Sequence, residues 1–192
     1  MSANINCHCG ACGFEIASRE PCLSLLCGCV DCRQALEWCA KKGAVRPVSL
    51  PELIYVKSDI IAVNGIQFIR AFQLRPEARS TRLYCNKCFS IIGVDHKSYK
   101  NNVFMFFKNH CFTTCDLSLN PSAAIYLKDL EETDKINKLK SIPLIYTFSE
   151  AEFRLFRSIE AVSKSFSDTN RPRSGQNLKS VIQSLGEIEI VN

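Results

Sequence analysis

Three short clusters of cysteines constrain the fold of this chain more than any other feature. The clusters are Cys7-His8-Cys9, Cys27-Gly28-Cys29-Val30-Asp31-Cys32 and Cys85-Asn86-Lys87-Cys88. Cysteines this close in sequence are poor disulfide partners, because a disulfide requires two Cβ atoms that face each other at a defined separation. A tetrahedral zinc ion, in contrast, is readily bound by such pairs. The sequence therefore predicts that zinc organises the fold.

Composition and the N-terminal residues set the class of protein. The chain has 192 residues, of which 46% are hydrophobic and 22% charged, as is typical of a globular protein. The first residues carry no basic segment followed by an apolar core, so we expect no secretory signal. No apolar run reaches the ~18 residues of a membrane span, so we expect no membrane partner. Clustered thiols then indicate metal binding in a reducing compartment, the cytoplasm or alternatively the nucleus.

The formal net charge of +5 raises the question of nucleic-acid binding. The positive excess lies within residues 1–127, because the rest of the chain has equal numbers of basic and acidic side chains. Thiolates that bind zinc would offset much of this excess. No block of five or more basic residues is present. The sequence therefore argues against nucleic acid as the partner.

The first two thirds of the chain have the sequence pattern of a β protein. Residues 4–16 predict a hairpin with a turn rich in Cys and Gly, and residues 33–42 predict a helix that ends at Gly43. Short apolar runs predict strands at 23–26, 53–63, 68–74, 81–85, 91–94 and 103–107. Many short strands with few helices predict a mainly β fold, a small zinc-bearing antiparallel β-sandwich.

The character of the sequence changes near residue 130. We predict a zinc domain at 1–129 and a C-terminal extension at 130–192. Within the extension, a capping signal and apolar residues at helical spacing predict one amphipathic helix over 149–167. The polar stretch 167–176 predicts a flexible linker, and 178–191 a short helix or strand.

The third cluster and the first supply a complete ligand set for one metal. Cys85 and Cys88 offer two sulfurs from a tight turn, and Cys7 and Cys9 form the natural partner pair. We therefore predict a structural zinc held by these four cysteines. Metal binding would then contribute directly to folding, because it joins the N-terminus to a distant turn.

The second cluster supplies three sulfurs, from Cys27, Cys29 and Cys32. Three protein ligands leave a fourth zinc position for water or substrate, which is typical of a catalytic metal. The alternative is a closed structural site. Its fourth ligand would be Cys12, Cys22 or His8. Spacing does not separate these alternatives. The remaining thiols at Cys39, Cys111 and Cys115 are interpreted as packing.

The ordered motifs resemble a known family. They are Cys7-x-Cys9-Gly10, Cys27-x-Cys29-x-x-Cys32-Arg33 and Arg82-x-Tyr84-Cys85-x-x-Cys88. This arrangement over residues 4–127 resembles the glutathione-dependent formaldehyde-activating enzymes, a family that includes centromere protein V. The segment 121–125 is similar to the closing segment of the family domain. The chain departs from the family pattern at Gly28, where His is frequent, and at Phe89, where Gly is usual.

The resemblance implies a β-sandwich shared with methionine-R-sulfoxide reductases and a Rab-exchange accessory factor. It implies two zinc ions per chain, a structural one on Cys7, Cys9, Cys85 and Cys88 and a catalytic one on the 27/29/32 cluster. The implied reaction adds the thiol of glutathione to formaldehyde, and its reverse is that of a carbon–sulfur lyase. The small thiol is then the partner.

Three readings compete for the function. The first is the zinc-dependent enzyme, in which Arg33 or Arg82 either orients the thiol substrate or braces the zinc loops. The second is a non-catalytic zinc module that binds a protein or chromatin. The third, a sulfoxide reductase, would need Cys111 or Cys115 as its redox cysteine. The oligomeric state is left open.

Overall fold

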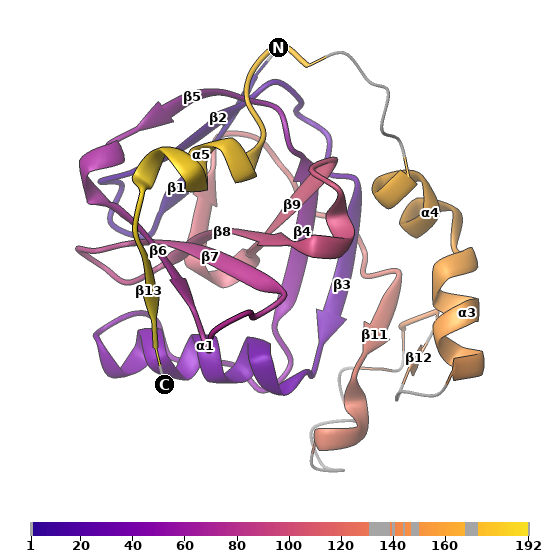
Figure 1. Cartoon of the computed structure of the whole chain (residues 1–192). Helices are drawn as coiled ribbons and strands as arrows, with labels where there is room; N and C mark the ends of the chain where they lie inside the picture. Colours follow the sequence, from indigo (N-terminus) through magenta and orange to yellow (C-terminus); the bar gives the residue numbers. More distant parts are fainter. Residues whose placement is uncertain are drawn as a thin grey trace.

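The computed structural model describes residues 2–130, 139, 141–143, 145–146, 150–167 and 173–191. Two packed β-sheets form its centre, with α1 along one side (Figure 1). The prediction of a mainly β fold is confirmed.

The smaller sheet carries the N-terminal hairpin. Its four strands, in spatial order, are β10 (Cys111–Thr113), β1 (Ala3–Cys7), β2 (Gly13–Ile16) and β5 (Ile60–Asn64). All three pairings are antiparallel, and Ile5 lies opposite Phe14 in the hairpin, as predicted. The hairpin turn therefore presents Cys7 and Cys9 at one end of this sheet.

The larger sheet runs through both halves of the chain. Its strands, in spatial order, are β12 (Ile145–Tyr146), β11 (Ala123–Ile125), β3 (Leu23–Cys27), β4 (Glu52–Lys57), β9 (Val103–Phe107), β8 (Ile91–His96), β7 (Ser80–Cys85), β6 (Ile69–Gln73) and β13 (Ile188–Ile190). The central pairings are antiparallel, but β11 is parallel to both β3 and β12, and β13 is parallel to β6. The expected purely antiparallel sandwich is therefore wrong at both margins. There the strands arrive through long connections rather than hairpins.

The central strands are apolar on both faces because both faces are buried. In β4, Ile54 and Val56 face the smaller sheet, whereas Leu53 and Tyr55 face the other side. A strand that is covered on both faces has a continuous apolar sequence rather than an alternating one. The predicted single strand 53–63 is in fact two strands, because the chain leaves the larger sheet after Lys57 and enters the smaller one at β5.

Helix α1 (Val30–Lys41) covers the outer face of the larger sheet. Its buried residues Ala35, Leu36 and Cys39 pack into the same cluster as the strand residues. The helix begins three residues earlier than predicted, since Cys29 serves as its N-cap. It ends at Lys41 with Lys42 as its C-cap, and Gly43 follows with a φ of +107° that favours glycine.

The C-terminal helices add to this outer cluster. The predicted helix 149–167 is instead α3 (Glu150–Ser158) and α4 (Glu160–Ser167), while residue 149 lies outside the described residues. At the break, the Ile159 N–H donates to the Phe156 carbonyl three residues earlier, so the helical turn tightens there. In α4, Phe166 stacks on Tyr99 with the ring centroids 5.4 Å apart.

The last described segment is part of the main body. The expected linker is wrong for residues 173–176, because the N–H groups of Ser174 and Gly175 donate to the Asp59 carboxylate at 2.7–3.1 Å. Residues 168–172 lie outside the described range. Both a helix and a strand follow: α5 (Leu178–Leu185) buries an apolar face between the sheets and β13 extends the larger sheet. The boundary at residue 129 stays a prediction.

Candidate metal centres

Two hairpin turns form the first centre. Cys7 ends β1 and Cys9 lies in the turn that follows, while Cys85 ends β7 and Cys88 lies in the turn toward β8. In the first turn, Gly10 has a φ of +73° and its N–H donates to the Cys7 carbonyl at 2.9 Å. A side chain rarely adopts this backbone conformation, so glycine allows the chain to fold back around the sulfurs.

The four sulfurs are spaced as a tetrahedral metal requires. All four lie within 4.8 Å of one another. The Cys7 and Cys9 sulfurs are 3.6 Å apart, and the Cys9 and Cys85 sulfurs 3.8 Å apart. A Zn–S distance of about 2.3 Å in a regular tetrahedron gives an S···S separation of about 3.8 Å. The group could therefore hold a metal ion with little rearrangement.

Two of the proposed alternative ligands lie at this first centre. The Cys12 N–H donates to the Cys7 sulfur at 3.4 Å, and the Cys12 thiol is buried beside it. The His8 N–H donates to Ser90 Oγ at 3.4 Å, and its ring stacks on Phe112. Neither residue belongs to the cluster at residues 27–32, so neither is its fourth ligand in this structure.

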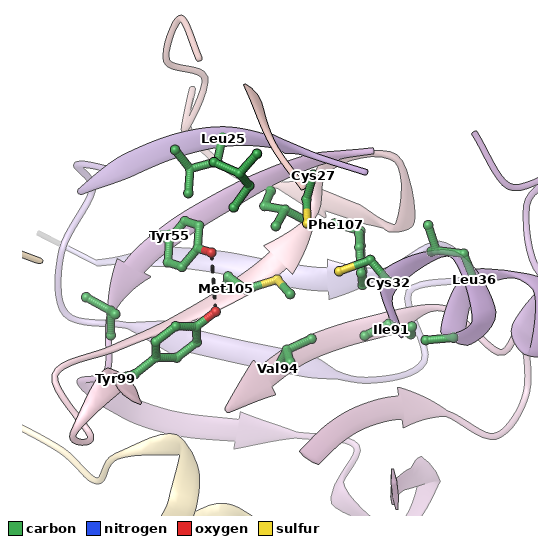
Figure 2. Packing of buried hydrophobic residues seen from close by; sticks show 14 of the residues in the cluster. Leu25, Cys27, Cys32, Leu36, Tyr55, Ile91, Val94, Tyr99, Met105 and Phe107 are labelled. Carbon is green, nitrogen blue, oxygen red and sulfur yellow. Dashed lines mark hydrogen bonds between the residues drawn. The ribbon is translucent and has the colours of Figure 1, made fainter. Parts of the chain in front are cut away.

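The second centre lies where β3 ends and α1 begins. Cys27 is the last residue of β3, Cys29 is the N-cap of α1, and Cys32 is in its first turn. Their three sulfurs lie within 4.8 Å of one another. Cys27 and Cys32 are buried, with their side chains directed into the apolar interior near Met105 and Phe107 (Figure 2). Only Cys29 is half-exposed.

Electrostatics favour a thiolate at Cys29. Hydrogen bonds from the thiols of Cys27 and Cys32, together with the Cys32 N–H at 3.3 Å, lower the pKa of Cys29 to about 3. The hydrogen bond between the Cys27 thiol and the Cys29 sulfur raises the pKa of Cys27, which acts as the donor. A helix N-terminus is a further source of positive potential at this position. One sulfur of the three is thus favoured as a thiolate, and the pKa values of the other two, Cys27 and Cys32, are raised beside it.

No fourth protein ligand joins this group within the described part of the chain. Cys22, the remaining alternative, precedes the first residue of β3, at the end of the strand opposite Cys27. There its N–H donates to the Tyr55 carbonyl. It lines a cavity of about 770 Å³ between Lys57, Asn102 and α4, away from the three sulfurs. The chain therefore supplies four sulfurs to one group and three to the other.

The glycine between the two ligands has a packing reason. The Gly28 N–H donates to the Ile125 carbonyl at 2.9 Å, so the chain passes close to the segment after β11. A Cβ at this position would lie 2.8 Å from the Tyr126 carbonyl oxygen and 3.0 Å from Leu130. Glycine therefore suits residue 28, because any side chain there meets this segment.

Phe89, in the turn after Cys88, has a backbone conformation that is more usual for glycine. Its φ is +54°, in the left-handed region. The ring stacks on Tyr84 with the centroids 5.9 Å apart and meets the edge of Trp38 at 6.4 Å. Aromatic contacts between the turn and α1 therefore compensate for the backbone strain.

The two arginines of the motifs have different environments. Arg82 is 1% exposed, and its Nη2 donates to the Asp31 carbonyl at 3.3 Å. Arg33 is half-buried, and its Nε has no hydrogen-bond partner within the described ranges. The sequence motif contains both residues but gives no sign that Arg82 is buried, since strand β7 also contains half-buried polar positions at Ser80 and Thr81.

The other thiols and His96 lie outside both groups. Cys39 is buried on α1, the Cys111 thiol donates to the Ile91 carbonyl at 3.4 Å, and the Cys115 thiol contacts the Arg19 carbonyl at 3.7 Å. These environments agree with the packing interpretation. His96 ends β8 and is half-buried, and burial lowers its pKa to about 4.

No described helix combines the length and apolar character that crossing a bilayer requires. A scan against protein-family models finds no match to this sequence, and a search of curated proteins finds none either. The resemblance stated from the cysteine motifs therefore stays a prediction.

Proposed function

We propose that this protein is a zinc-dependent enzyme that joins a small thiol, such as glutathione, to the carbon of formaldehyde or a related aldehyde. The observation that carries the proposal is the contrast between the two sulfur groups. One group has four cysteines, whereas the other has three and no described fourth ligand. A metal with three protein ligands keeps a position for a substrate.

The donor sets fit zinc. Cysteine sulfurs are soft ligands, and closely spaced pairs with S···S separations of 3.6 and 3.8 Å suit tetrahedral coordination. Cys7, Cys9, Cys85 and Cys88 would hold a structural zinc, and the 27/29/32 cluster a catalytic one. A bound zinc would lower the pKa of the entering thiol, which is otherwise mostly protonated at neutral pH.

The chain's own residues would guide the substrate. Cys29 is the half-exposed member of the cluster, and its neighbour Val30 is 41% exposed, so a small molecule reaches the sulfurs from this side. The Nε of Arg33, one residue after Cys32, has no hydrogen-bond partner in the described residues. Glutathione carries carboxylates, so Arg33 is our choice for binding them, while Arg82 braces the loop through the Asp31 carbonyl.

The reaction is balanced without any redox step. The thiol sulfur forms a bond to the aldehyde carbon, the carbonyl π bond breaks, and the oxygen takes up the proton that the thiol lost. The product is a hydroxymethyl thioether. A reducing cytoplasm, in which glutathione keeps thiols free, suits both this substrate and the exposed cysteines.

The test follows adduct formation at equilibrium by NMR exchange between glutathione, formaldehyde and the product. We expect the zinc-loaded protein to accelerate exchange above the uncatalysed rate. Cys29→Ser should abolish this acceleration, and Cys115→Ser, which alters a half-exposed cysteine outside both groups, should preserve it. Equal exchange with and without the protein would refute the formaldehyde reaction.

A second function is supported by the burial of the second cluster. Two of its three sulfurs, those of Cys27 and Cys32, are buried, and the large cavity lies elsewhere. A non-catalytic zinc module that binds a protein or chromatin would be consistent with both facts. X-ray absorption of the zinc protein separates the functions. Metal coordination that does not change at either site when glutathione is added would favour the non-catalytic module.

A further inference from the structure

Arg82 is the only Lys, Arg, Asp or Glu residue that is buried among the described side chains, with an exposure of 1%. It lies on β7, where its neighbours across the sheet are Phe72 and Val94. Its guanidinium carbon is 5.9 Å from the centroid of the Phe72 ring. A cation in such apolar surroundings is strongly unfavourable unless a negative charge is close.

No described carboxylate provides that charge. The Nη2 group of Arg82 donates to the Asp31 backbone carbonyl at 3.3 Å, while Nε and Nη1 have no partner within the described residues. The Asp31 carboxylate points outward instead and pairs with exposed Arg75 at 2.9 and 3.0 Å. Two donors of a buried arginine are therefore left to interact with something other than a described acidic side chain.

The sulfur cluster flanks this contact in the sequence. Asp31 lies between Cys29 and Cys32, so the hydrogen bond to its carbonyl places the guanidinium beside this loop. Arg82 also interacts electrostatically with the thiols of Cys32 and Cys39. The other sulfur group differs, because its Cys9 is exposed and water can solvate its charge.

Charge counting gives the consequence. Three thiolates around a divalent metal leave a net charge of −1, which one arginine neutralises. A neutral fourth ligand would need no further compensation, whereas a thiolate adds a second negative charge in the interior. The buried guanidinium makes that addition less unfavourable.

We propose that Arg82 is a positioning residue that compensates the charge of the three-cysteine metal site, so that its fourth position favours an anionic thiolate over a neutral ligand. This inference rests on the proposed function and deepens it. It defines the substrate class as thiols that bind in their deprotonated form. The loop brace through Asp31 is then a second effect of the same side chain.

The test uses the cobalt(II)-substituted protein, whose sulfur-to-cobalt and d–d absorption bands report the metal's ligands. Titration with 2-mercaptoethanol measures binding of a thiolate, and titration with imidazole measures binding of a neutral ligand. We expect Arg82→Gln to weaken thiolate binding about tenfold or more and to leave imidazole binding within about twofold, because an adjacent opposite charge favours the anionic form. Arg75→Gln, at the exposed side of Asp31, is the matched control and should change neither.

The conservative variant separates charge from bracing. Arg82→Lys keeps the positive charge but loses the planar fork that reaches the Asp31 carbonyl, so the preference for thiolate should survive. Loss of that preference in the lysine variant would overturn the proposal, and this comparison decides the matter if Arg82→Gln does not fold. Equal weakening of thiolate binding and imidazole binding in Arg82→Gln would also overturn the proposal.

The failure of the proposed function has a different signature. If the wild-type cobalt spectrum does not respond to either ligand, the second site is closed and the proposed enzyme is wrong. If the wild-type spectrum responds and Arg82→Gln retains the same thiolate preference, only the role of Arg82 is wrong.

Discussion

Cys9→Ser is the sharpest test of the metal-based fold, because Cys9 is exposed. A substitution of one exposed small side chain by another normally changes the free energy of unfolding by no more than about 0.5 kcal/mol. Cys9 therefore separates metal binding from core packing, which a buried ligand such as Cys85 would not. Any large effect must come through the metal.

The expected magnitude follows from the length of chain that the metal closes. The Cys9 and Cys85 sulfurs are 3.8 Å apart although the residues are separated by 76 positions. In the chain-entropy treatment of cross-links, closing a loop of this length stabilises the folded state by about 4.5 kcal/mol. With the usual unfolding entropy for 192 residues, that free energy corresponds to a melting temperature about 10 °C higher.

The assay compares thermal melting with and without a zinc chelator. We expect Cys9→Ser to melt up to about 10 °C below the zinc-loaded wild type. The chelator should lower the melting temperature of the wild type more than that of the variant. The second centre is present in both proteins, so its loss cancels from the comparison. Cys115→Ser serves as the control. If Cys9→Ser melts within a degree or two of this control, the metal does not close the loop and the reasoning fails.

Three further changes test local features. Gly28→Ala should lower the free energy of unfolding by about 1–3 kcal/mol in denaturant titrations, because the added Cβ meets the Tyr126 carbonyl; unchanged stability would contradict this packing. Phe89→Gly should be more stable than Phe89→Ala by about 1 kcal/mol, since glycine accepts the φ of +54° without strain; the reverse order in melting experiments would exclude it. Burial and His8 lower the pKa of His110 to about 4 from 6.5, so the unfolded state binds the proton first and stability is lost as pH falls between these values. His110→Asn keeps an acceptor for the Ile91 N–H, and its free energy of unfolding should fall by up to about 3 kcal/mol less than that of the wild type over that pH range. Parallel profiles of unfolding free energy against pH would refute this expectation.

The sequence could predict both sulfur groups because their members are locally paired. Spacings such as Cys85-x-x-Cys88 place two sulfurs on one turn whatever the surrounding fold. It could not select among the alternative fourth ligands. Cys22 and Cys27 lie at opposite ends of one extended segment, about 16 Å apart at the usual rise per residue, which excludes Cys22 once the strand is known to reach Cys27.

Other features depend on contacts between distant segments. The helical periodicity after residue 149 predicted helix but gave no sign of the break at Ile159. The composition of residues 173–176 is that of a linker, but the Asp59 carboxylate and a backbone bridge between Gln176 and Ile60 fix them. In the first case a tight turn, and in the second a set of tertiary contacts, outweighs a local preference.

The sequence alone determined the mainly β character, the limits of the central strands within a few residues, and the composition of the two sulfur groups. These properties follow from apolar patterning and from ligand spacing, which are local. Only the tertiary structure decided that Cys12 and His8 lie beside the first centre, that β11 and β13 pair in parallel, and that Arg82 is buried beside the loop of Cys29 and Cys32. The physical reason is that such proximities depend on how separate strands are stacked, and no neighbouring residue in the chain encodes that arrangement.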